Sequence, residues 1–184
     1  MNVALLKTWT VQDYLDWADT QSERRRTELI NGQIVAMSPE RADHNRIKLS
    51  ICMALVQAVR LARLPCEVFT DGMTVPIDLH TAYEPDALIH CGPRIPPNQV
   101  TVPAPTIVVE VLSPTSAHSD TSAKLIGYFK IASIRHYLVI DPEQRSIAHH
   151  MRLNDGTVAA NTQRSGTLRL DPPGIEIALV DVFG

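Results

Sequence analysis

The chain has 184 residues, a formal net charge of −3 and 45% hydrophobic residues. This length and apolar content are ordinary for a globular protein, so we expect one domain over residues 1–184. The small negative charge gives no general attraction to nucleic acid, but it does not exclude a local basic surface. No apolar stretch approaches the roughly 20 residues that span a bilayer, and the N-terminus lacks a signal-peptide pattern. We therefore expect a cytoplasmic protein without membrane contact.

The three cysteines, Cys52, Cys66 and Cys91, are widely spaced within apolar segments. They match neither a disulfide framework nor a zinc-binding pattern. We expect reduced thiols in the core.

The N-terminal third predicts a helix, a hairpin and a second helix. Thr10 is a suitable N-cap for a short helix over residues 10–18, and Asn31-Gly32 favours a type I′ turn between two strands over 28–35. A polar stretch through Arg24-Arg25-Arg26 lies between them, and its default interpretation is a solvated charge run. Apolar residues then recur every four positions from Asp43, the expected helix cap, to about Leu64, where Pro65 ends the pattern.

The rest of the chain predicts a sheet with one parallel crossover. Strands are expected over 67–70, 73–77, 84–89 and 107–112, and later over 136–140, 146–153, 167–170 and 175–180. A helix over about 119–132 joins strands 107–112 and 136–140, so these two strands should be parallel with a right-handed crossover. The sum is an α/β fold with a mixed central β-sheet flanked by helices, plus the N-terminal helix and hairpin.

Two acidic residues interrupt consecutive apolar strands. Asp86 lies near the start of the strand over 84–89, and Glu110 lies near the end of the strand over 107–112. A carboxylate in a buried strand is costly unless a cation or hydrogen-bond donors meet it. If the strands pair antiparallel across the proline-rich connection, both carboxylates lie at one edge of the sheet, as a divalent metal site requires. The alternative is that they cap turns or pair with arginines.

A Pro-Asp pair followed by a strand that carries E-x-K resembles the PD-(D/E)XK nuclease superfamily. Pro85-Asp86 and Glu110 match this pattern, but Leu112 stands at the lysine position. Asp120, Lys124 and Tyr128 are spaced i, i+4, i+8 on one face of the following helix. Because that helix leaves the edge at which Glu110 lies, Lys124 can return an ammonium to the site.

This migrated lysine is similar to that of the Uma-type restriction endonuclease family. The matching segments are spread over nearly the whole chain: Glu28-Leu29-Ile30-x-Gly32, Met37-Ser38-Pro39, His44, Glu84-Pro85-Asp86, Val109 to Pro114, Asp120, Lys124, Tyr128 and Tyr137 to Pro142. The resemblance implies a restriction-endonuclease-like fold, a Mg²⁺ site and homodimers.

The chemistry suits these residue types. Mg²⁺ prefers oxygen ligands, so Asp86, Glu110 and the backbone carbonyl of Val111 are the expected ligands, with Mn²⁺ as a substitute ion. Lys124 would place positive charge beside the attacking water or the scissile phosphate, and we expect Lys124→Ala to lower turnover by about 10² or more with folding nearly unchanged. Glu28 matches the family's N-terminal glutamate and is a further candidate.

Each of these residues also has a structural interpretation. Lys124 could be an exposed partner of Asp120, and Glu28 a surface residue that begins a hairpin. Tyr128 at helical spacing is typical of core packing, whereas His44 could serve the start of its helix rather than approach phosphate. Scattered histidines and a Ser113 without a nucleophile elbow do not indicate a histidine metal site or a serine hydrolase.

The expected function is Mg²⁺-dependent endonuclease cleavage of DNA. The alternative is a noncatalytic dimeric module that keeps the nuclease fold to bind nucleic acid or a protein, and the acidic composition favours it. A third class is a metal-dependent hydrolase of a small phosphate ester, because the same chemistry fits any phosphate ester.

Overall fold

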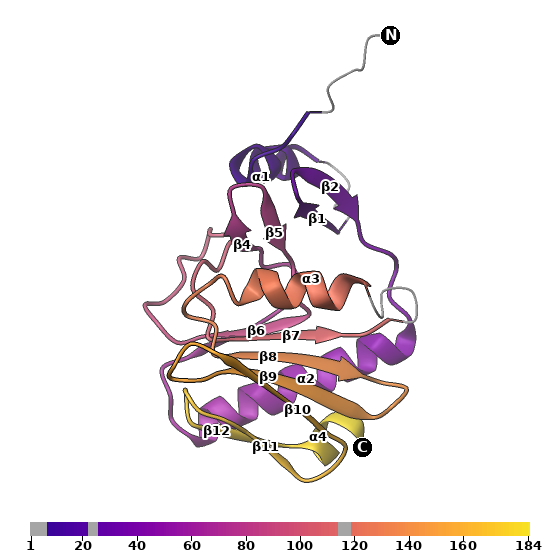
Figure 1. Ribbon diagram of the computed structural model, residues 1–184, viewed down its shortest axis with the longest axis vertical. Coiled ribbons are helices and arrows are strands. Elements are labelled where there is room, and N and C mark those ends of the chain that lie inside the picture. Colours follow the sequence, from indigo (N-terminus) through magenta and orange to yellow (C-terminus); the bar gives the residue numbers. More distant parts are fainter. Residues whose placement is uncertain (1–6, 22–25, 114–118) are drawn as a thin grey trace.

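The structure is a computed structural model that describes residues 7–21, 26–113 and 119–184 (Figure 1). Its helices are α1 (Val11–Thr20), α2 (Ala42–Leu61), α3 (Ser119–Tyr128) and α4 (Leu179–Phe183). Its strands are β1 (Thr27–Ile30), β2 (Gln33–Ala36), β3 (Glu67–Thr70), β4 (Val75–Asp78), β5 (Thr81–Tyr83), β6 (Ala87–His90), β7 (Ile107–Val111), β8 (His136–Asp141), β9 (Ser146–Arg152), β10 (Val158–Gln163), β11 (Thr167–Leu170) and β12 (Ile175–Ala178). None of the helices in the described part of the chain has the length and apolar character to cross a membrane.

A six-stranded sheet in the order β10-β9-β8-β7-β6-β3 forms the centre of the molecule. β7 and β8 are parallel and α3 lies between them in the chain, which confirms the predicted parallel pairing. β6 and β7 are antiparallel with Ala87 opposite Val109, as expected for the two acidic strands. Continued by one residue, this register places Asp86 opposite Glu110.

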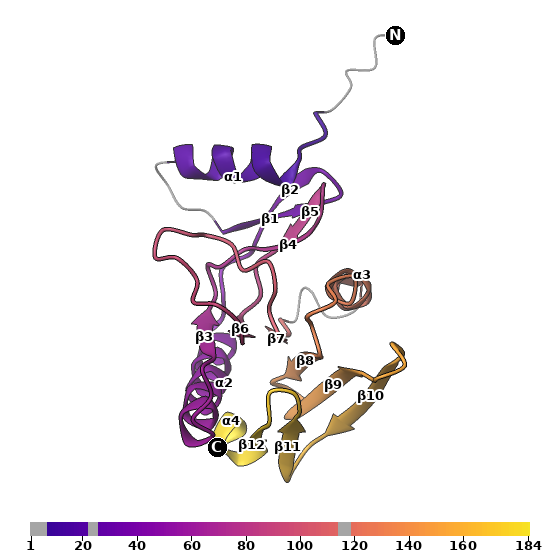
Figure 2. The ribbon, with the colours of Figure 1, turned by 90° about the vertical axis from the view of Figure 1, so that its left-hand side faces the viewer.

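The central sheet is covered on both faces, which explains its nearly continuous apolar strands. Alternate residues of β7 enter two different cores: Val109 packs with residues of α2 and α4, whereas Val108 packs with Tyr128 of α3. Figure 2 shows α2 and α3 on opposite sides of the sheet. Glu110 follows the same alternation as Val108 and therefore faces α3. The predicted mixed sheet flanked by helices is confirmed.

A second sheet, in the order β2-β1-β5-β4, lies beside the first and carries α1 (Figures 1 and 2). The hairpin turn has positive φ at both Asn31 and Gly32, 49° and 76°, as the type I′ turn requires. Thr10 caps α1 and forms a reciprocal capping box with Asp13. Tyr14 from α1 donates to the carbonyl oxygen of Thr27 at 2.6 Å and so fixes the helix on β1.

Several boundaries differ from the sequence prediction. α2 ends at Leu61 and α3 at Tyr128, both earlier than expected, and Arg41 rather than Asp43 occupies the N-cap of α2. The expected strand over 175–180 ends at Ala178, where α4 begins. β5 and β10 were not predicted, and the expected strand over 84–89 begins at Ala87, so Asp86 precedes it.

The prediction of three reduced cysteines is wrong for two of them. Cys66 and Cys91 form a disulfide with their Cα atoms 4.3 Å apart. The reason lies in the register, because β3 and β6 pair with Glu67 opposite His90, so the next residues outward also face each other. Cys52 is buried and free, as predicted.

Two buried histidines join β8 to β9. Nε2 of His136 lies 2.8 Å from the carbonyl oxygen of Pro172 and donates to it, so Nδ1 of His136 accepts from Nε2 of His149, also at 2.8 Å. His136 is fully buried and His149 is 9% exposed. Burial lowers the pKa of both imidazoles, to about 4 for His149.

This pair should make stability fall in acid. Between the ordinary value of 6.5 and about 4, the unfolded chain binds a proton that folded His149 does not, so stability present above pH 6.5 is lost over that window. Urea unfolding at pH 7.5 and at pH 4.5 gives the change in the free energy of unfolding between these pH values. We expect this change to be about 1–3 kcal/mol smaller in His149→Gln than in the wild type. His80→Gln, a change outside the pair, should follow the wild-type curve, and equal slopes for all three proteins would contradict this account.

Candidate functional site

Glu110 lies near the end of β7, where polar side chains surround its buried carboxylate. Nζ of Lys124 is 3.0 Å from Oε1 of Glu110, and the hydroxyl of Tyr128 donates to the same oxygen at 2.7 Å. Lys124 also lies 2.9 Å from Oε1 of Glu28 on β1. Glu28, Glu110 and Lys124 are only 5%, 8% and 5% exposed. The structure thus brings together three residues that the sequence selected, with Tyr128 as the fourth member of the cluster.

Glu28 connects the two sheets at this point. Its Oε1 accepts the backbone N–H of Glu84 at 2.8 Å and also contacts the ammonium of Lys124. Since Glu84 immediately precedes Pro85-Asp86, this carboxylate also fixes the chain that leads into Asp86. Glu28 is therefore a buried member of the site and not an exposed start of the hairpin.

One carboxyl group of the cluster has a raised pKa. Burial raises the pKa of Glu110 to about 7, and the charges of Asp86 and Glu28 act in the same direction, whereas Lys124 and the hydroxyl of Tyr128 oppose it. Burial, followed by the charge of Glu110, also raises the pKa of Tyr128. A carboxyl group that titrates near neutral pH beside a buried ammonium is typical of a functional site.

Asp86 makes its contacts at the same end of the strands but toward α2. Its Oδ2 accepts the backbone N–H of Val111 at 2.7 Å. His44, from the first turns of α2, places Nε2 3.0 Å from the carbonyl oxygen of Val111 and 3.5 Å from Oδ2 of Asp86. The contact with Asp86 raises the pKa of His44. His44 therefore approaches two of the three groups expected to hold a metal ion.

The described residues contain one group of three His, Cys, Asp or Glu side chains whose ligand atoms lie within 4.8 Å of one another: Glu40, His44 and Asp86. This group shares only Asp86 with the set Asp86, Glu110 and Val111 expected from the sequence. Glu110 contacts Lys124 and Tyr128 of α3, whereas Asp86 contacts His44 of α2. The Asp86–Glu110 ligand set stays a prediction, and the structure adds His44 and Glu40 as nearby candidates.

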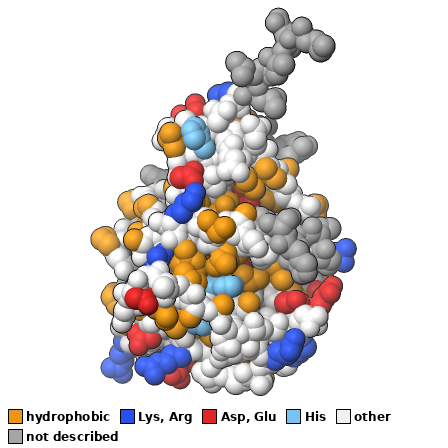
Figure 3. Space-filling model, in the orientation of Figure 1, with side chains coloured by type: hydrophobic (Ala, Val, Ile, Leu, Met, Phe, Trp, Pro, Cys, Tyr) orange, Lys and Arg blue, Asp and Glu red, His pale blue; other side chains and the backbone are white. Residues whose placement is uncertain are grey.

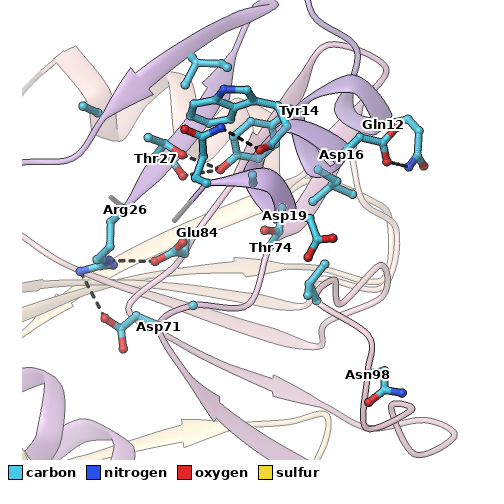
Figure 4. A pocket seen from close by; sticks show the side chains of 18 residues that line it. Gln12, Tyr14, Asp16, Asp19, Arg26, Thr27, Asp71, Thr74, Glu84 and Asn98 are labelled. Atoms are coloured by element: carbon cyan, nitrogen blue, oxygen red, sulfur yellow. Dashed lines mark hydrogen bonds and ion pairs between the residues drawn. The ribbon is translucent and has the colours of Figure 1, made fainter. Parts of the chain in front are cut away.

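An ion-pair network surrounds this group and was not predicted. Arg26 contacts Glu40, Glu84 through a 2.8 Å bond and Asp71 at 3.2 Å (Figure 4). Lys48, one turn after His44 on α2, lies 2.6 Å from Oε2 of Glu40 and 2.9 Å from Asp71. Burial opposes the effect, but hydrogen bonds from Lys48 and Asn45 and the nearby positive charges lower the pKa of Glu40 to about 2. Glu40 is therefore a carboxylate whose charge is already balanced.

Of the remaining sequence candidates, some lie outside the described residues and one, Arg26, is described. Arg24 and Arg25 lie outside the described residues, and so does the side chain of Asp120. Arg26 is described and is half-buried, so the interpretation of the basic run as solvated does not hold for its last residue. The spacing of Glu40, His44 and Lys48 by four residues was the available signal for the network.

Tyr128→Phe should lower the free energy of unfolding, while the other contacts of the cluster remain. The change removes a donor to a buried carboxylate, and hydrogen bonds to charged groups contribute about 1.5–3 kcal/mol to stability. The control is Tyr14→Phe, which removes a 2.6 Å bond to a neutral carbonyl and should cost about 0.5–1.5 kcal/mol. Urea unfolding of both variants at pH 8 provides the comparison. A smaller loss for Tyr128→Phe than for Tyr14→Phe would show that this hydroxyl does not stabilise an ionised Glu110.

Comparison with known proteins gives a family and a fold. Residues 11–180 match Uma2, a family described as "Putative restriction endonuclease". Two proteins from Synechocystis, both named as uncharacterized, are similar: sll1609 is 27% identical over 84% of this chain and 87% of its own length, and slr1290 is 29% identical over 94% and 89%. A crystal structure described as a putative nuclease belonging to DUF820, from Anabaena variabilis, matches with a TM-score of 0.75 and 15% identity over 95% of this chain and 97% of that chain.

Proposed function

Because this chain belongs to the Uma2 family, described as "Putative restriction endonuclease", we propose that it hydrolyses phosphodiester bonds in DNA with Mg²⁺. The restriction-endonuclease-like fold expected from the sequence agrees with the DUF820 nuclease structure. The observation that carries the proposal is the buried Glu28–Lys124–Glu110 arrangement next to Asp86, since such a set of charges is costly without a role.

The donor groups fit a hard divalent ion. Asp86 and the carbonyl of Val111 both approach Nε2 of His44, so their oxygens face a common point, and Glu110 is opposite Asp86 in the strand register. We propose Asp86, Glu110 and the Val111 carbonyl as the ligands, with Mn²⁺ able to replace Mg²⁺. A bound ion of this kind lowers the pKa of a water ligand and offsets negative charge on the phosphate in the transition state.

The protein groups around this point have separable roles. Lys124 supplies a fixed positive charge, because its ammonium is buried and held at two oxygens before substrate arrives. Glu28 and Tyr128 are positioning residues: Glu28 holds Lys124, and Tyr128 holds the carboxylate of Glu110.

The surface allows a second candidate. On the face shown in Figure 3, the described Lys and Arg side chains are scattered and lie beside Asp and Glu side chains, without a continuous basic surface. This charge pattern favours a noncatalytic module over a tight nonspecific DNA binder. A hydrolase of a small phosphate ester is the third possibility carried from the sequence. We also propose homodimer formation, on the basis of the family resemblance. A cytoplasmic location is proposed from the sequence.

One assay separates these functions. Purified protein is incubated with supercoiled plasmid and with single-stranded DNA, each with Mg²⁺, Mn²⁺ or EDTA, and Glu110→Ala is treated identically. We expect cleavage that needs the metal and disappears in Glu110→Ala. DNA binding without metal-dependent cleavage would support the noncatalytic module, and hydrolysis of a generic aryl phosphate alone would support the small-ester enzyme.

A further inference from the structure

A cleft of about 1110 Å³ opens beside the candidate site. It lies between α1, the β1–β2 hairpin, the turn after β3 and the loop around Asn98, and Figure 4 shows it from close by. Arg26, Asp71 and Glu84 gather at one end of the cleft, away from Asn98. Through Arg26, whose Nη2 is 4.0 Å from Oδ1 of Asp86, the cleft adjoins the proposed metal site. Its volume lies slightly above the range of about 300–1,000 Å³ that is common for small-molecule sites.

The charges of the lining disfavour a phosphate group. Four carboxylates line the cleft, from Asp16, Asp19, Asp71 and Glu84, against one cation among the described lining residues, Arg26. Arg26 is already engaged by Glu40, Glu84 and Asp71, so it offers little attraction to a new anion. A nucleic-acid backbone should therefore pass outside this cleft.

Cations already pair with two of the four carboxylates, which limits the attraction of the cleft for a strongly cationic ligand. Arg26 pairs with Asp71 and Glu84, and Lys48 pairs with Asp71 as well. Asp16 accepts a 2.7 Å hydrogen bond from the neutral amide of Gln12 and keeps its charge. The lining therefore offers hydrogen-bond acceptors at its carboxylates, together with the amide of Asn98. A neutral ligand with N–H donors matches this chemistry.

An aromatic platform completes the cleft. Trp17 lines it and is only partly exposed, with its ring supported by Trp9 at 6.1 Å and by Tyr14 at 6.2 Å between centroids. An indole held in this way can stack on a flat heterocycle, as aromatic side chains do with the bases of single strands. Exocyclic amino groups and ring N–H groups of a base could then donate to the acceptors, but only where these edges are not already paired.

We propose that this cleft binds an unpaired nucleobase of the strand whose phosphate lies at Asp86, so that the substrate class is single-stranded or locally unpaired nucleic acid. Trp17 stacks on the base, Asp19 and Asn98 contact its polar edge, and the backbone passes outside the cleft toward Asp86. The location of the phosphate rests on the proposed function, whereas the base-binding property of the cleft can be tested by itself.

The test measures binding in EDTA, where no cleavage occurs. The chain has two tryptophans, so Trp9→Phe leaves Trp17 as the only indole and its fluorescence reports on the cleft. Trp9→Phe protein is titrated with a dodecanucleotide single strand, the matching duplex, and the same single strand with abasic sites. We expect saturable quenching by the intact single strand and binding of the abasic strand and the duplex weaker by about fivefold or more. Trp17→Leu, followed by anisotropy of a labelled strand, should lose affinity by a similar factor.

Three results would overturn the inference: equal binding of intact and abasic strands, equal quenching by duplex and single strand, or displacement of the strand by spermine or an oligolysine peptide at lower concentration. The comparison between intact and abasic strands uses a protein that keeps Trp17, so it decides the question even if Trp17→Leu does not fold. Base-dependent quenching without cleavage in the plasmid assay would refute the proposed function alone, and cleavage without base-dependent quenching would refute this inference alone.

Discussion

Replacing Lys124 with alanine is expected to lower the free energy of unfolding by about 3–5 kcal/mol, because the change leaves buried carboxylates without their cation. Lys124 is 5% exposed and its ammonium lies 2.9 Å from Glu28 and 3.0 Å from Glu110. The sequence interpretation expected nearly unchanged folding, since it gave Lys124 a role only in stabilising the charge that develops during attack. The structure revises that expectation, and any loss of turnover in Lys124→Ala must be measured on protein that is shown to be folded.

The loss of unfolding free energy in Lys124→Ala should be larger at high pH than at low pH. Burial already raises the pKa of Glu110 to about 7, and removing Lys124 takes away the largest opposing influence, so the folded variant binds a proton more readily. A group whose pKa is raised on folding adds stability at low pH, where it is protonated. This stability is lost as the pH rises through the raised pKa. Urea unfolding should therefore show the full loss at pH 8 and a smaller loss at pH 6.

The matched control is Lys130→Ala. Lys130 forms a 2.8 Å ion pair with Asp78, but its side chain is 53% exposed, so water replaces the lost partner. Its removal should cost no more than about 1 kcal/mol at either pH. If Lys124→Ala and Lys130→Ala lose the same stability, Glu28 and Glu110 are not a charged, desolvated pair in the folded protein.

Much of the fold follows from local patterns, and the exceptions show where such patterns fail. The pairing of β6 with β7 and the parallel β7–β8 crossover were predicted, since apolar strands, a helix of sufficient length and turn residues are all local features. β10 was missed because residues 158–163 lack apolar alternation and form an exposed edge of the sheet. The Cys66–Cys91 disulfide was missed because it depends on the β3–β6 register, which the sequence does not reveal.

The candidate site divides in the same way. The contacts of Lys124 and Tyr128 with Glu110 follow from helical spacing and from the direction in which the helix leaves the strand. The contacts of Arg26 with Glu40 and Asp71 could not be predicted, because these residues come from separate loops that meet only when the two sheets pack. The four-residue spacing of Glu40, His44 and Lys48 indicates only the α2 side of the network and gives no sign of Arg26 or Asp71.

Asp86→Asn is expected to abolish metal-dependent cleavage while the protein stays folded. The asparagine oxygen can still accept the N–H of Val111, now 2.7 Å from Oδ2, so the strand end keeps its hydrogen bond. The negative charge that would hold the ion is lost. Since removing even an indirect partner of a metal ligand costs about 10–100-fold in affinity, loss of a direct ligand should weaken Mn²⁺ binding by about 100-fold or more. Calorimetry with Mn²⁺ measures this loss, and plasmid nicking measures the accompanying activity.

Asp78→Asn provides the control for a general loss of negative charge, because Asp78 ends β4, is exposed and pairs with Lys130, which is not part of the candidate site. It should bind Mn²⁺ like the wild type. The more informative contradiction would be an Asp86→Asn protein that keeps full Mn²⁺ affinity. An ion bound without Asp86 could use neither the Asp86–Glu110 set nor the Glu40–His44–Asp86 group, since both contain that residue. Glu28 and Glu110 would then remain as the buried carboxylates, and because Lys124 now lies between them, the ion would have to displace its ammonium.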